Sequence, residues 1–153
     1  MKIILKFFLF FFIFTNICNA DLIKPNINLK PFDVLMIQLN SLKNNNNPYK
    51  DAGIEQTWEF AHPKNKKFTG PLEKFKKMIK GDSFNMLVDH KEHEIKQVYL
   101  NENVATFLVT ILDSDKNYYK FKWQVEKYND EGPLKDCWLT TAVSQPVSLG
   151  SSI

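Results

Sequence analysis

The feature that most constrains this chain is a change of hydrophobic period at Gly81. Within 31–44, apolar residues recur at spacings of three and four, which is typical of an amphipathic helix. Beyond Gly81 the helical spacing is lost: 103–112 is an apolar run rich in β-branched residues, and apolar and polar residues alternate through 118–128. This predicts two long strands joined by a hairpin loop at 113–117. Helices followed by an antiparallel meander predict an α+β domain in which the helices cover one face of a curved sheet.

The element boundaries follow from proline and glycine. Pro31 suits a first helical turn, and Pro63 ends a helix because proline cannot continue one. Gly70 is expected to cap a further helix that has Pro71 at its first position, and the lysine-rich residues before Gly70 are expected to form a link. We therefore expect helices at 31–44, 51–60 and 71–80, and strands at 83–88, 94–100, 103–112, 118–128 and 136–143.

The two ends of the chain are expected to lie outside the folded domain. Residues 1–20 combine basic residues, the apolar run Phe7 to Phe14 and small residues before Ala20, which is typical of a cleaved signal peptide. An uncleaved membrane anchor is the alternative, although the apolar run is short for a span. We expect an extended arm at 21–30, a single domain at 31–143 and a loose tail at 144–153.

Charge and composition limit the partners. The chain has 20 basic and 17 acidic residues, and two of the lysines lie in the expected leader, so the rest is close to neutral. All the basic residues are lysine, whereas arginine is the usual bidentate partner of phosphate and guanine. A nucleic-acid binder is therefore not expected. The sequence indicates a protein of the secretory pathway or the outside of the cell, with a plastid reached through that pathway as the alternative.

Four segments carry a family resemblance: "VLMIQLNSL" at 34–42, "GIEQTWEFAHPKN" at 53–65, "TGPLEKFKKMI" at 69–79 and "CWLTTAV" at 137–143. Together they resemble the family called domain of unknown function 4864, which is similar to the nuclear-transport-factor-2-like superfamily. The resemblance implies a cone of bent antiparallel strands wrapped on helices. It implies no particular function, because that superfamily includes both enzymes and binding domains. His62 stands where many members carry serine.

The inward rows of the two long strands are apolar, and Tyr119 is their one titratable residue. Acid–base catalysis needs an inward carboxylate or histidine, so a binding or assembly module without catalysis or cofactor is favoured over a small-molecule enzyme. We expect these rings to fill the cone, because they are bulky and few inward polar groups could orient a ligand. A pocket for a small apolar ligand is the alternative. The residues expected to line the inside of the cone are Trp58, Phe107, Tyr119, Phe121 and Trp123.

The helix expected at 71–80 is strongly basic, as is the link before it. A solvated face of a helix that closes the core is the favoured interpretation. Binding of anionic lipid headgroups is the alternative, because each surface lysine adds favourable energy there. The lysines concerned are Lys64, Lys66, Lys67, Lys74, Lys77 and Lys80.

Three further features bear on sites and partners. His90 and His93 are expected to point to opposite faces of extended chain, and no metal signature completes the pair. Cys137 is expected to be a buried, inert thiol, with an intermolecular disulfide as the alternative. The outward row of 103–112 is unusually apolar at Val104, Leu108 and Leu112. This favours weak self-association or cover by a protein partner, with cover by the chain's own tail as the alternative.

Overall fold

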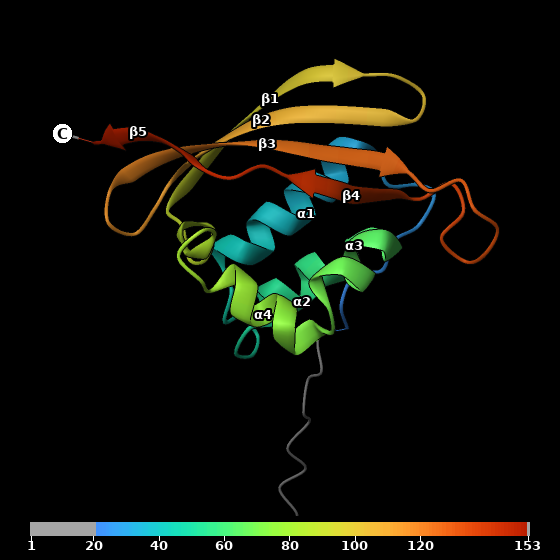
Figure 1. Ribbon diagram of the computed structural model, residues 1–153, viewed down its shortest axis with the longest axis horizontal. Helices are drawn as coiled ribbons and strands as arrows, with labels where there is room; N and C mark the ends of the chain where they lie inside the picture. The colour runs from blue at the N-terminus through green and yellow to red at the C-terminus, as the bar shows by residue number, and fades with distance from the viewer. Residues whose placement is uncertain (1–20, 153) are drawn as a thin grey trace, which may run out of the picture.

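The computed structural model describes residues 21–152, and the expected leader at 1–20 lies outside them. The described chain folds into four α-helices followed by a five-stranded antiparallel sheet, so the α+β class is confirmed. Figure 1 shows all four helices gathered against one face of the curled sheet. None of the helices within 21–152 has the length and apolarity that a membrane crossing requires.

The first two helices cross at very close range. Helix α1 (Pro31–Lys43) begins with Asp33 accepting a hydrogen bond from the Lys30 backbone N–H, at 2.9 Å. Helix α2 (Ala52–Glu59) packs on α1 at Gly53, where a Cβ atom would lie 2.0 Å from the Ser41 carbonyl oxygen. Only glycine fits at this crossing.

The lysine-rich link proves to be a helix, α3 (Pro63–Thr69). Its start is fixed by the His62 side chain, whose Nδ1 accepts a hydrogen bond from the Lys64 N–H at 3.1 Å. Proline then occupies the first helical position, where its missing N–H costs nothing. Helix α4 (Leu72–Ile79) follows directly, with Pro71 rather than Gly70 as its N-cap.

The sheet has the strand order β1-β2-β3-β4, and β5 pairs with β3 beside β4. The register sets Phe107 of β2 opposite Trp123 of β3. The strands are β1 (Glu92–Leu100), β2 (Val104–Leu112), β3 (Asn117–Lys127), β4 (Trp138–Val143) and β5 (Val147–Ser151).

Two expectations about the strands were wrong. Residues 83–88 form turns and a short 3-10 helix, η1 (Asn85–Leu87), because Phe84 and Asn85 donate their N–H groups back to the Gly81 carbonyl. The tail at 144–153 is not loose, because 147–151 form β5. Strand β4 pairs only with the second half of β3, so the first half of β3 keeps an open edge that β5 occupies.

The core lies between the inner face of the sheet and α1. Phe107 and Phe121 are fully buried there, in one cluster with Leu35 and Leu39 of α1. On the outer face of the sheet the apolar row of β2 is half-buried, and its Thr110 is flanked by Glu94 of β1 and Lys120 of β3. Self-association through that face stays a prediction.

The crossing of α1 and α2 gives the first test. Gly53→Ala is expected to lower the free energy of unfolding by about 3 kcal/mol, because the added methyl group forces two backbones apart. Urea denaturation followed by circular dichroism measures the change. In the control variant Gly81→Ala the new Cβ lies 3.3 Å from its nearest neighbour, so a loss below about 1 kcal/mol is expected. Equal losses in both variants would contradict the tight crossing.

Candidate functional site

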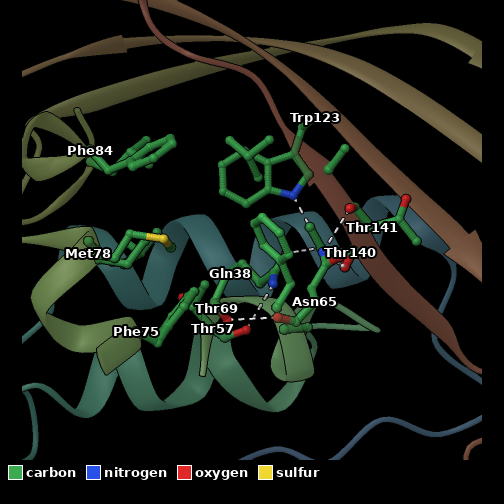
Figure 2. A pocket seen from close by; sticks show the side chains of 17 residues that line it. Gln38, Thr57, Asn65, Thr69, Phe75, Met78, Phe84, Trp123, Thr140 and Thr141 are labelled. Carbon is green, nitrogen blue, oxygen red and sulfur yellow. Dashed lines mark hydrogen bonds between the residues drawn. The ribbon is translucent and has the colours of Figure 1, made fainter. Parts of the chain in front are cut away.

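A cavity of about 290 Å³ lies between the helices and the β4 side of the sheet (Figure 2). Its wall is drawn from all four helices, from η1 and its preceding turn, and from strands β3 and β4. The lining residues are Gln38, Leu42, Thr57, Ala61, Asn65, Phe68, Thr69, Phe75, Met78, Ile79, Phe84, Leu87, Trp123 and Thr140 to Val143.

A chain of buried hydrogen bonds forms the polar part of the wall. The Trp123 Nε1–H donates to Thr140 Oγ1 at 3.2 Å, and that hydroxyl donates to Gln38 Oε1 at 2.6 Å. The Gln38 Nε2 in turn donates to the Thr57 carbonyl at 3.1 Å. All four side chains are buried, and the chain links β3, β4, α1 and α2. The network therefore holds four elements in register around the cavity.

Asn65 attaches α3 to the sheet beside this network. Its Nδ2 donates to the backbone carbonyls of Thr140 and Thr141, at 3.1 and 2.7 Å. Both donor hydrogens of the amide are thereby used, while no donor within 21–152 reaches its Oδ1. The Oδ1 is an acceptor at the cavity wall that remains free for a bound molecule.

The opposite wall is apolar and opens to solvent. Phe75 and Ile79 of α4 are buried, whereas Met78 on the same helix is 36% exposed. Phe68 of α3 is 88% exposed although it also lines the cavity. The mouth of the cavity therefore lies at Phe68 and Met78.

The cavity wall has no ionisable side chain. The lining residues are aliphatic, aromatic, amide or hydroxyl residues, without Asp, Glu, His, Lys, Cys or Tyr among them. A charged molecule inside would lose its hydration without gaining a counter-ion, which is unfavourable by several kcal/mol. No lining side chain titrates near neutral pH, so the wall offers no general acid or base.

The five aromatic residues expected to line the inside of the cone are placed differently from one another. Trp123 lies on the cavity wall, while Phe107 and Phe121 are fully buried away from it. Trp58 is half-buried with its ring centroid 4.9 Å from that of Phe75, and Tyr119 packs at the border of the core. The bulky rings thus fill the cone, and the cavity forms to one side.

Three polar residues of the site were missed from the sequence: Gln38, Asn65 and Thr140. Gln38 follows the helical spacing of the core residues Leu35 and Leu42, so a long polar side chain at a core-facing position was the available signal. No sequence pattern indicated that Asn65 faces the cavity, because its segment was expected to be a link without regular structure.

The six basic residues singled out earlier divide between two environments. Lys66 is half-buried, with its Nζ 5.5 Å from the centre of the Trp58 ring, and Lys80 forms an ion pair with Asp51 at 2.6 Å. The others are exposed without a carboxylate within 4 Å among the described residues: Lys64, Lys67, Lys74 and Lys77.

The expectation that His90 and His93 point apart was wrong. Asp89 has a φ of 53° and His90 precedes β1, so the pair is not in regular extended chain. Nε2 of His90 lies 2.8 Å from Nδ1 of His93, and Nδ1 of His90 lies 2.7 Å from the Leu87 carbonyl. The second contact requires His90 to carry its proton on Nδ1, so its Nε2 accepts from His93. Within 21–152 no group of three or more potential metal-binding side chains occurs.

Cys137 is buried, as predicted. Burial, together with the nearby Asp136 carboxylate, raises the pKa of its thiol. The thiol is therefore held protonated and unreactive at neutral pH.

Comparisons of the chain with protein-family models, with curated proteins and with solved structures found no match. The resemblance of 31–143 to the family of domain 4864 therefore stays a prediction.

The network around Thr140 gives the second test. Thr140→Val is expected to lower the free energy of unfolding by about 3 kcal/mol, because it leaves the Trp123 N–H and the Gln38 Oε1 buried without partners. Thr140→Ser keeps the hydroxyl and is expected to lose less than about 1 kcal/mol. Urea denaturation of both variants measures the difference, and equal losses would show that the hydroxyl does not matter.

The histidine pair gives the third test. Burial lowers the pKa of His90 to about 4, whereas histidine in an unfolded chain titrates near 6.5. Between these two pKa values His90 is protonated in the unfolded chain but neutral in the folded chain. Its contribution to the free energy of unfolding is therefore fully present above pH 6.5 and is lost as the pH falls toward 4. From pH 7 to pH 5 the expected loss is about 2 kcal/mol.

Urea midpoints at pH 7, 6 and 5 measure this loss, with His90→Asn as the comparison. The variant keeps an amide donor for the Leu87 carbonyl but cannot titrate, so its stability is expected to change less with pH than that of the wild type. An unchanged pH dependence in the variant would show that His90 is not responsible.

Proposed function

We propose that this chain is a non-catalytic binding protein that holds one small, neutral, largely apolar molecule in the cavity beside β4. The observation that carries the proposal is a preformed cavity of about 290 Å³ whose wall has no ionisable side chain. Pockets for small molecules are typically mostly apolar, with a few placed polar groups.

The size of the cavity sets the size of the ligand. Liquid water occupies about 30 Å³ per molecule, so the space equals that of about ten waters. A molecule of on the order of ten to fifteen non-hydrogen atoms fits, such as a medium-chain alcohol or a naphthalene-sized ring system.

The polar wall sets the chemistry of the ligand. The buried amide and hydroxyl groups at the floor already satisfy one another, so they draw no strong polar group inward. Asn65 Oδ1 remains as an acceptor, which favours a ligand with a hydroxyl or N–H group at one end. Affinity then comes chiefly from the burial of apolar surface.

A secretory or extracellular location belongs to the same proposal, since a carrier that works between cells or compartments needs the expected leader at 1–20. The small-molecule enzyme is the less favoured alternative, because the cavity wall supplies no acid or base.

Binding of an alcohol series tests the proposal. Displacement of the neutral fluorescent dye 1-naphthylamine by straight-chain alcohols of six to twelve carbons is expected to strengthen about four-fold per added methylene, until the chain fills the cavity. Octylamine, which is cationic at neutral pH, is expected to bind at least about ten-fold more weakly than octan-1-ol, because its ammonium group finds no carboxylate in the cavity wall.

A blocked cavity provides the control. Val143→Trp places a large ring in the cavity wall, because Val143 is paired with the inward-facing Trp123 and packs against the core, and it is expected to weaken dye binding at least about ten-fold. Val147→Trp adds the same ring at an exposed site on β5 outside the lining and is expected to leave binding unchanged. Equal effects of the two variants, or octylamine binding as tightly as octan-1-ol, would contradict the proposal.

A further inference from the structure

Helices α3 and α4 carry the same five-residue pattern. The segment "KNKKF" at 64–68 and the segment "KFKKM" at 74–78 both have lysine at positions one, three and four and a large apolar residue at position five. The structure gives each position of this pattern the same environment in the two helices, as follows.

Position two points inward and position three is tied down. Asn65 bonds to β4 and Phe75 is buried in the core. Lys66 donates to the Glu59 carbonyl at 3.3 Å, and Lys76 forms ion pairs with Glu55 and Glu73 at 2.8 and 3.0 Å. These two lysines hold α3 and α4 against α2 and are not free for a partner.

Positions one and four are lysines whose charges face solvent. Lys64 and Lys67 on α3, and Lys74 and Lys77 on α4, are exposed and have no carboxylate within 4 Å among the described residues. Glu73 is the one acidic residue within 63–80, and it is already paired with Lys76. The surface is therefore strongly positive and not neutralised by the protein itself.

The apolar residues at position five lie at the mouth of the cavity. Phe68 and Met78 each lie one turn beyond the position-one lysine of their own helix, so lysine and apolar side chain are neighbours on the helix surface. Both apolar side chains line the cavity and are also exposed, Phe68 by 88%. Two large apolar side chains at the opening thus have exposed lysines as their neighbours on α3 and α4.

We propose that this mouth docks on an anionic lipid bilayer, with Phe68 and Met78 entering the interfacial region and the four lysines contacting the headgroups. Apolar side chains beside unpaired lysines are the combination that binds such interfaces, because the two contributions add. A nucleic acid would satisfy the lysines but not the two apolar side chains. The biological role of this docking rests on the proposed function, because docking would bring the opening of the cavity to the membrane, which is a source of apolar molecules.

Flotation with vesicles tests the docking without any cavity ligand. Vesicles of phosphatidylcholine alone are compared with vesicles in which about one lipid in three is phosphatidylserine, at low and at physiological salt. The wild type and all variants carry the same N-terminus. The wild type is expected to bind the anionic vesicles preferentially and to lose affinity as salt rises.

Two variants and one control give the decisive comparison. Each lysine near an anionic surface contributes a factor of about five, so K67Q/K74Q/K77Q is expected to weaken binding about 100-fold. F68A is expected to weaken it about ten-fold while leaving the salt dependence unchanged. The control K91Q/K96Q/K122Q removes the same charge from exposed lysines on the sheet side and is expected to stay within a few-fold of the wild type.

Several outcomes would overturn the docking: equal loss in the two triple variants, no effect of F68A, or binding to RNA in place of anionic vesicles. Alcohol binding in the absence of vesicles reports on the cavity alone. Alcohol binding without vesicle binding would refute the docking and leave the proposed carrier function intact. Vesicle binding without alcohol binding would refute the carrier function and leave the docking intact.

Discussion

The rest of this structure depends on the two hydrogen bonds that the Thr140 hydroxyl makes. It accepts from Trp123 on the neighbouring strand and donates to Gln38 on α1, 102 residues away in sequence. The backbone on either side of that hydroxyl holds α2 and α3 as well, because the Phe60 carbonyl accepts from the Thr140 N–H and the Thr140 carbonyl accepts from His62 and Asn65. A single residue of β4 therefore meets three helices and one strand.

This arrangement also explains why a cavity can persist next to a well-packed core. A helix that leans on a sheet through apolar contacts alone would settle inward and close a gap of this size. Here, directed hydrogen bonds from Gln38 and Asn65 fix how far α1 and α3 stand from β4. The polar groups act as spacers, and the apolar residues of α4 close the remaining side without filling it.

Much of the fold followed from the sequence, and the cavity did not. Strand β3 alternates cleanly and β2 is an apolar run rich in β-branched residues, so β2, β3 and their hairpin could be placed from local pattern. Helix α3 was missed because its residues are mostly polar and show no apolar helical stripe. It is held by a local cap at His62 and by the tertiary hydrogen bonds of Asn65 to β4. Strand β5 was missed because it forms by pairing with the open edge of β3, and the residues of β5 themselves give no sign of this pairing. The cavity depends on how α3 and α4 sit on β4, so it could not be predicted while α3 was taken for a link.

The pairing of β5 has a consequence for how the protein behaves at high concentration. An unpaired strand edge invites the same edge of another molecule and leads to aggregates. Strand β5 covers the open half of β3, and as the new edge it is short, begins after Pro146, and has a bulge in its register and Gly150 at a φ of 97°. Strand β1, at the other edge, has charged residues and a register shift near Val98. Neither edge is flat enough to serve as a template, so the sheet is protected from endless strand addition by the irregularity of its own borders.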